Sequence, residues 1–259
     1  PQARALAALL SEVKDVRGTV YRSQAGATLD AVELYEIKRL CAAFQELSRR
    51  GQEPGWPAPA EWVPEYPAAL ARELDPSARG DSAFYIDDGF SPALRRIRGL
   101  KHRCEQELAA ERQRLEAAAV SSLGLASGWP GELAVARSEA RLEELMASEL
   151  LQLTRELRSH VFFQVRASLR QQELEENLSR LKAREFRAEE AVRRRLSRQV
   201  AKSAQLLLEN LEKLAKLDLL LAKARLGGRL QATEPRLLEE TGLQLTGGRH
   251  PGVEESLRR

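Results

Sequence analysis

The sequence contains few cysteine, histidine and aromatic residues, which small-molecule enzymes and secreted disulfide-rich proteins commonly use. It contains two cysteines and three histidines in 259 residues, and only 5% of its residues are aromatic. Two cysteines exclude a disulfide framework or a cysteine-rich zinc site, so we expect a reducing, cytoplasmic setting. No run of eighteen apolar residues occurs, and we therefore expect no membrane partner.

Charged and aliphatic residues are abundant instead. Charged residues make up 31% of the chain and hydrophobic residues 43%. With so few aromatics, this composition is typical of long helices rather than of a compact enzyme. The net charge of +3 permits binding to a polyanion but does not by itself predict it. Because the sequence begins at Pro1 inside a helical pattern, we expect a piece of a longer protein.

Apolar residues at helical spacing predict a helical bundle in residues 1–90. One helix is expected from Leu6 to Val16, and a second over residues 29–50. The second helix has an apolar stripe formed by Leu34, Ile37, Leu40, Cys41, Phe44 and Leu47. The proline-rich segment that follows must be a loop. We expect its Trp56 and Trp62 to cover an edge of the core, and ligand binding is the alternative.

Two longer helices are predicted to form an antiparallel hairpin. Ser91 as N-cap and Pro92 as first helical residue predict a helix over residues 91–120. Its narrow coiled-coil seam is formed by Leu94, Ile97, Leu100, Cys104, Leu108 and Leu115. Residues 169–226 lack glycine and proline and predict one return helix of roughly 85 Å. Since this helix is about twice as long as the first, we expect its second half to pack against the bundle.

The segment between these helices, residues 121–168, predicts a small tip. Alternating apolar residues predict three short strands in residues 128–137, 149–157 and 159–168, and a short helix in residues 138–148. In the last strand we expect Val161, Phe163 and Val165 on one face and His160, Phe162, Gln164 and Arg166 on the other. The expected fold class is mainly α: a helical core bundle and a long antiparallel coiled-coil pair that carries a small α/β tip.

No catalytic or metal-binding constellation can be assembled from the sequence. The histidines, His102, His160 and His250, lie in unrelated segments without partners at ligand spacing. The glycines of "TGGRHPG" (246–252) lack the lysine of a phosphate-binding loop. We therefore expect no catalytic residue, cofactor or metal in this chain, and no nucleotide hydrolysis by it alone.

Arginines are the remaining candidate site residues. On the predicted tip these are Arg137, Arg155, Arg158 and Arg166, which are suited to phosphate contact, although nearby glutamates such as Glu149 and Glu156 nearly cancel their charge. A second basic run, Arg193, Arg194 and Arg195, lies on the return helix. The alternative for this run is a solvated helix face paired with Glu189 and Glu190. Composition alone leaves DNA contact undecided.

Three segments, in this order, resemble the MutS family of DNA mismatch-repair ATPases. "ELDPSARGDSAFYIDDGFSPALRRIRGLKHR" (73–103) resembles the entry into that family's lever helices. "NLEKLAKLDLLLAKARL" (210–226) is similar to the return from lever to core. "LTGGRHPGVEE" (245–255) resembles the Gly-Arg-His-Pro stretch that precedes the ATPase domain.

The resemblance implies an order of regions. It consists of helical core 1–90, ascending lever 91–120, clamp 121–168, returning lever and core 169–226, and a linker with the first strand of a truncated ATPase domain in 227–259. It also implies that the clamp grips the backbone of double-stranded DNA, mismatched or branched. ATP, Mg²⁺, a homodimer and a repair partner protein would belong to the parent protein, an ATPase expected in a bacterial cytoplasm near the nucleoid.

Two alternatives stay open at this point. The N-terminal domain that carries the family's mismatch-reading Phe-x-Glu motif is not among the regions that this sequence resembles. The parent is therefore either a mismatch sensor or a member of the second MutS-like branch, which acts on recombination intermediates or stalled ribosomes. A structural coiled-coil scaffold whose tip binds a protein is an alternative of a different class.

Overall fold

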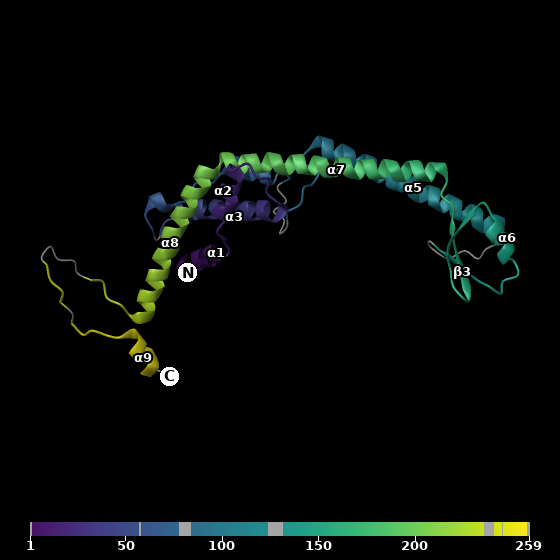
Figure 1. The fold of residues 1–259 in the computed structure, drawn as a ribbon. Coiled ribbons are helices and arrows are strands. Elements are labelled where there is room, and N and C mark those ends of the chain that lie inside the picture. The colour runs from purple at the N-terminus through teal and green to yellow at the C-terminus, as the bar shows by residue number, and fades with distance from the viewer. Residues whose placement is uncertain are drawn as a thin grey trace. The chain divides into compact units, whose positions relative to one another are not determined.

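The computed structural model describes residues 2–56, 58–77, 84–123, 132–235, 241–244 and 246–257. The chain divides into two compact units (Figure 1). Unit 1 consists of Pro1–Phe84 and Arg193–Arg259, and unit 2 consists of Tyr85–Val192. Residues 128–131 of the first predicted strand, residues 78–83 of the segment that resembles the lever entry, and Leu245 lie outside the described residues.

Unit 1 is helical. Its elements are α1 (Gln2–Ser11), α2 (Arg17–Gln24), α3 (Ala31–Gly51), the short 3-10 helix η1 (Ala60–Trp62), α4 (Ala68–Leu74), the end of α7 (Leu169–Lys202), α8 (Ala204–Leu230) and α9 (Pro251–Leu257). The helix predicted over residues 29–50 is present as α3. The helix predicted from Leu6 to Val16 is present in part as α1, which begins at Gln2 and already ends at Ser11. The sequence reasoning did not separate the short helices α2 and α4.

Helix α3 provides much of the core of unit 1. It begins at a capping box in which the Asp30 carboxylate accepts from the Glu33 N–H, 2.8 Å, and the Glu33 carboxylate accepts from the Asp30 N–H, 2.9 Å. All six residues of the predicted apolar stripe are buried. Among them, burial raises the pKa of the Cys41 thiol to about 12, so this thiol is not a reactive nucleophile.

The loop after α3 covers an edge of this core, as expected. Trp56 and Trp62 are partly buried. A Cβ added at Gly51 would lie 2.5 Å from a methyl group of Val63, so the Val63 side chain of the loop packs directly against the α3 backbone. The Asn210 amide of α8 fixes the loop further, because it donates to the Glu65 carbonyl, 2.7 Å, and accepts from the Glu65 N–H, 3.0 Å.

The second half of the predicted return helix packs in unit 1, as expected. Helix α8 contacts α1, α2 and η1, and the Ser197 hydroxyl of α7 accepts from the Leu29 N–H, 2.8 Å. The prediction of one unbroken helix was wrong. The helix breaks at Ser203, whose N–H is shared between the carbonyls of Gln199 and Val200 at 3.1 Å each.

The end of the chain differs from the sequence expectation. Helix α8 continues through Gly227 and Gly228 to Leu230, and Gln231 ends it in the left-handed conformation, φ 50°. A strand was expected in residues 227–259. In the described part of that range the regular element is instead the helix α9, which begins at Pro251. The ring of His250, the residue before it, accepts a hydrogen bond from the Val253 N–H, 3.2 Å.

Unit 2 contains an antiparallel helix pair and a small tip. Its elements are α5 (Pro92–Leu123), β1 (Leu133–Ala136), α6 (Leu142–Ala147), β2 (Leu151–Glu156), β3 (His160–Val165) and the first part of α7. As residue numbers rise along α5 they fall along α7: Arg98 pairs with Glu185, and Arg112 with Glu175. The predicted Ser91 cap is confirmed, since its hydroxyl accepts from the Leu94 N–H, 3.4 Å.

The tip is a three-stranded antiparallel sheet in the order β1-β3-β2. Val161 and Phe163 of β3 are buried in its small core, and Val165 is partly buried beside them, which confirms the predicted inner face. The remaining core residues come from the other strands and α6: Leu133, Val135, Leu142, Leu145 and Leu151. The outer face of β3 is therefore available to polar side chains.

Candidate nucleic-acid interface

Arg155 is held on the outer face of the sheet. A register shift between Leu153 and Arg155 interrupts the β2–β3 ladder, and such bulges re-aim side chains. The Arg155 guanidinium lies over the ring of Phe162, 3.9 Å from its centroid. It also forms an ion pair with Glu132, 3.2 Å, and its side chain is 57% exposed. Stacking therefore orders a cation that solvent can still reach.

Arg137 and Arg158 lie at one end of the sheet. The Arg137 N–H donates to the Ser159 carbonyl, 3.0 Å, and its Nε donates to the Leu157 carbonyl, 2.9 Å. Its guanidinium also pairs with Glu156. Arg158 is exposed in the turn between β2 and β3, without an ion pair to any described residue.

Arg166 lies at the opposite end of β3. Its N–H donates to the Leu150 carbonyl, 2.8 Å, and its guanidinium reaches the Leu151 carbonyl, 3.5 Å. The six residues of β3 separate it from the β2–β3 turn by roughly 20 Å. The structure thus brings Arg137 and Arg158 to one end of the sheet and places Arg166 apart from them.

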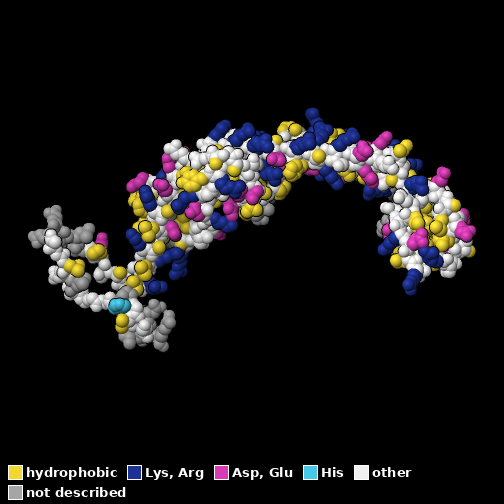
Figure 2. All heavy atoms as spheres, in the orientation of Figure 1, with side chains coloured by type: hydrophobic (Ala, Val, Ile, Leu, Met, Phe, Trp, Pro, Cys, Tyr) yellow, Lys and Arg dark blue, Asp and Glu magenta, His cyan; other side chains and the backbone are white. Residues whose placement is uncertain are grey.

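Glutamates offset part of the positive charge of the tip arginines. The sequence had offered this pairing as the alternative to DNA contact. Glu156 pairs with Arg137 as that alternative anticipated, whereas the partner of Arg155 is Glu132. Figure 2 shows basic and acidic side chains together around the apolar centre of the tip. Arg158 and Arg166 are the two candidates here without a carboxylate partner among the described residues.

The run Arg193–Arg195 does not form one patch. Consecutive helical residues point about 100° apart, so the three side chains leave α7 in different directions. Arg195 forms a long ion pair with Glu73 of α4, 3.8 Å. Of the two glutamates that the alternative named, Glu189 binds Arg98.

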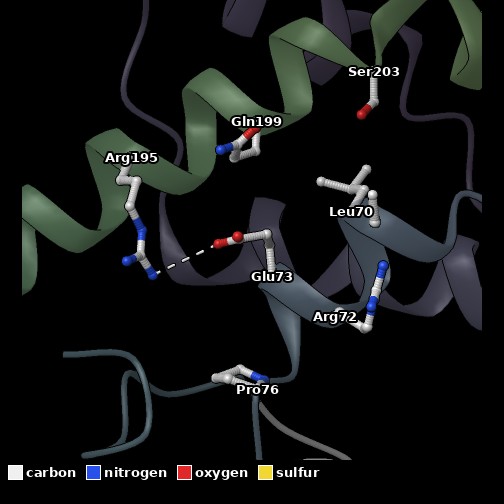
Figure 3. A pocket seen from close by; sticks show the side chains of 8 residues that line it. Leu70, Arg72, Glu73, Pro76, Arg195, Gln199 and Ser203 are labelled. Atoms are coloured by element: carbon white, nitrogen blue, oxygen red, sulfur yellow. Dashed lines mark ion pairs between the residues drawn. The ribbon is translucent and has the colours of Figure 1, made fainter.

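An open cavity of about 400 Å³ lies beside Arg195 in unit 1 (Figure 3). Its lining includes Leu70, Arg72, Glu73, Arg195, Gln199 and Ser203. Arg195 points towards the Glu73 carboxylate there, whereas Arg72 donates to the Ala68 carbonyl, 3.3 Å. Among the described residues, neither a histidine nor a cysteine lines the cavity to act as base or nucleophile. Over the described residues no cluster of three His, Cys, Asp or Glu side chains could hold a metal ion.

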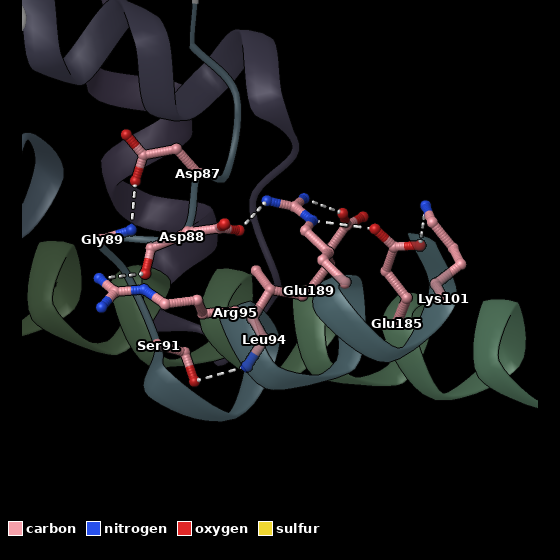
Figure 4. Close-up of polar contacts among 10 residues, drawn as sticks. Asp87, Asp88, Gly89, Ser91, Leu94, Arg95, Lys101, Glu185 and Glu189 are labelled. Atoms are coloured by element: carbon pink, nitrogen blue, oxygen red, sulfur yellow. Dashed lines mark hydrogen bonds and ion pairs between the residues drawn. The ribbon is translucent and has the colours of Figure 1, made fainter. Parts of the chain in front are cut away.

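Sequence reasoning missed an ion-pair cluster in unit 2 (Figure 4). Arg98 donates to Asp88, 3.0 Å, Glu185, 2.9 Å, and Glu189, 2.6 Å. Burial acts to raise the pKa of Glu185, but hydrogen bonds from Lys101 and Arg98 outweigh it, so that pKa is lowered. The sequence did contain a signal for this cluster: Glu185 and Glu189 are four residues apart on the return helix and therefore lie on the same helical face.

No protein-family model matches the chain. Among the described helices, none is both long and apolar enough to cross a membrane.

Parts of the chain are similar to curated MutS and MutS2 proteins. It is 30% identical to the DNA mismatch repair protein MutS of Azorhizobium caulinodans over 200 residues, which are 75% of this chain and 21% of that protein. It is 34% identical over 85 residues to Endonuclease MutS2 of Geobacillus sp., and 43% identical over 86 residues to Endonuclease MutS2 of Thermomicrobium roseum. Each of these two alignments covers 33% of this chain and 11% of the relative. The chain therefore spans a small part of its relatives' length, and the matches support a relationship to the MutS family.

Proposed function

We propose that this chain is the core, lever and clamp region of a MutS-like DNA repair ATPase. The partial similarity to MutS and MutS2 supports this, together with the order of a helical unit, a helix pair and a small sheet tip. In this proposal unit 1 is the core, α5 and α7 are the levers, and the sheet with α6 is the clamp. ATP, Mg²⁺, a homodimer, a repair partner and a cytoplasmic, nucleoid-associated location stay predictions about the longer protein.

The proposed task of the tip is to grip the backbone of double-stranded DNA. The observation that carries this is the presentation of Arg155, which is stacked on Phe162 and more than half exposed. A planar guanidinium that is already ordered loses less rotamer freedom when it binds a phosphate oxygen pair. Such contacts position a duplex without reading its bases. Arg158 in the neighbouring turn would add a second contact.

The test is the salt dependence of duplex affinity. Arg155, Arg158 and Arg166 are changed to Ala in the 259-residue chain, and binding to a labelled duplex is measured by fluorescence anisotropy at several salt concentrations. The expected slope of log affinity against log salt is shallower by about one unit per lost contact. Arg141→Ala is the matched control, because Arg141 is a tip arginine paired with Glu144, 3.0 Å. An unchanged slope would favour a scaffold whose tip binds a protein.

A second candidate function is that of the other MutS-like branch. The relatives named Endonuclease MutS2 favour it, since they match at 34% and 43% identity over their shorter alignments. The two candidates differ in the structure they prefer. Affinities for a matched duplex, a mismatched duplex and a branched junction of equal length separate them: preference for the mismatch supports the first, and preference for the junction supports the second.

A further inference from the structure

The helix pair of unit 2 has two unlike sides. On one side the charges are matched: Lys101 and Arg98 bind Glu185 at 2.6 and 2.9 Å, and Arg112 binds Glu175 at 2.8 Å. Each of these cations therefore has a carboxylate at hydrogen-bond distance.

The opposite side is a shallow groove of about 390 Å³ between α5 and α7. Leu100, Cys104, Leu174 and Leu181 contribute apolar lining, and Arg103 and Arg184 stand beside them. Both arginines are exposed, and neither has a hydrogen bond or ion pair with a described residue. Among the described residues, Glu107 is the one acidic side chain that lines this groove.

The arginines of the groove extend along the helices. Arg187 lies three residues after Arg184 on α7, on the same helical face, and it too is exposed without a partner in the described part of the chain. Arg96 lies two turns before Arg103 on α5. Figure 2 shows Lys and Arg side chains gathered along this helix pair. The rise from Arg184 to Arg187 along α7 is about 4.5 Å, so the two side chains leave the helix within one turn of each other.

We propose that this arginine side of the helix pair, formed by Arg103, Arg184 and Arg187, is a second surface that contacts the phosphate backbone of a nucleic-acid duplex. The proposal rests on the proposed function and extends it from the tip to the helices. These guanidinium groups need not give up a carboxylate to bind phosphate, whereas Arg137 and Arg155 on the tip must compete with Glu156 and Glu132. Unpaired arginines release counterions from the duplex at no such cost.

The experiment changes Arg103, Arg184 and Arg187 together to Ala in the 259-residue chain. Duplex affinity is measured by anisotropy between low and physiological salt, and circular dichroism checks that helix content and melting are kept. We expect the salt slope to become shallower by about three units, one for each lost contact. The matched control is Arg112→Ala, because Arg112 lies on the same helix pair, is 53% exposed and is paired with Glu175. Its slope should equal that of the parent chain.

Two further comparisons distinguish a failure of this proposal from a failure of the proposed function: the groove variant is compared with the tip variant, and duplex is compared with an acidic polypeptide. If the groove variant keeps the parent slope while the tip variant Arg155/Arg158/Arg166→Ala loses slope, the groove surface is overturned and the tip remains. If neither variant changes the slope, both proposals fail. Poly-L-glutamate serves as the protein-like probe. If the groove variant loses affinity for it and keeps the full salt slope on duplex, the surface binds an acidic protein and the nucleic-acid proposal is overturned.

Discussion

The core of unit 1 and the helix pair of unit 2 are held together by different means. In unit 1 the buried positions come from several helices and include Phe44, Ile37 and Leu207, each with no measurable exposure. Between α5 and α7 the buried side chains are fewer and include the small Cys104. Ion pairs flank that seam instead. Apolar burial therefore dominates unit 1, and the helix pair depends more on charge, so mutation, salt and pH should act on the two differently.

The largest expected effect lies in the core of unit 1. Phe44→Ala should lower the free energy of unfolding by about 3–5 kcal/mol, because a fully buried aromatic side chain leaves a cavity in a core built from several helices. The measurement is chemical denaturation, with hydrogen exchange of the α3 amides as a local readout. Val32→Ala on the same helix is the control; Val32 is 63% exposed, and its loss should change stability by less than about 0.5 kcal/mol. Equal effects of the two changes would contradict the burial described here.

Leu181→Ala tests apolar burial between the two helices of unit 2, for comparison with Phe44→Ala in unit 1. Leu181 is 5% exposed, but a seam between two helices can collapse onto a small cavity, so we expect about 2 kcal/mol, near the low end for such changes. Hydrogen exchange should accelerate in α5 and the first part of α7 and stay unchanged in α3. Faster exchange in α3 would show that the two units unfold together.

Removing Arg98 tests the contribution of charge. Arg98→Ala removes the guanidinium group that Asp88, Glu185 and Glu189 share as an ion-pair partner. We expect a loss of about 1–2 kcal/mol, since hydrogen bonds to charged groups contribute more than neutral ones but solvent reaches this cluster in part. The loss should shrink in 1 M salt, where the screening length is about 3 Å. Arg112→Ala removes one exposed pair and should cost less than about 1 kcal/mol. A loss that does not respond to salt would mean that Arg98 acts by packing.

The sequence predicted what periodicity controls. The stripe of α3 and the inner face of β3 follow from spacings of 3.6 and 2 residues, and both were right at every residue named. The break at Ser203 was missed because neither glycine nor proline marks it. Helix α2 was missed because it is only eight residues long and contains Gly18 in its first turn. The pairing of Arg155 with Glu132 and Phe162 could not be predicted either, because it depends on a bulge in β2.

The polar residues at core positions illustrate the same limit. Asn210 and Ser197 lie on the apolar faces of their helices and are buried. Their spacing shows that they face the core. Their partners, the backbones of Glu65 and Leu29, are more than a hundred residues away in sequence. Which backbone group a buried polar side chain binds is a property of tertiary packing, so a single sequence does not supply it.

The smallest expected effect concerns Glu111, a buried carboxylate in the seam of the helix pair. Hydrogen bonds from Arg114, and then from Ser168, lower the pKa of Glu111 from 4.5 to about 2. The Ser168 hydroxyl, which donates to Glu111 at 2.8 Å, also accepts from the Gln171 N–H at 3.0 Å and so caps the start of α7. Because the folded pKa lies below the unfolded one, ionised Glu111 contributes stability that is complete above about pH 4.5 and is lost as the pH falls towards 2.

Glu111→Gln tests this pH dependence at nearly constant side-chain size. The variant should be less stable than the parent chain at pH 7, and the two should converge as the pH falls from 4.5 to 2. The measurement is the free energy of unfolding as a function of pH, with Glu116→Gln, an exposed change on the same helix, as the control. Convergence would assign the acid sensitivity of this joint to the ionised Glu111. A difference that stays constant from pH 7 to pH 2 would instead show that Glu111 contributes through its shape and neutral hydrogen bonds, and that the charge of Glu111 adds nothing to the joint between α5 and α7.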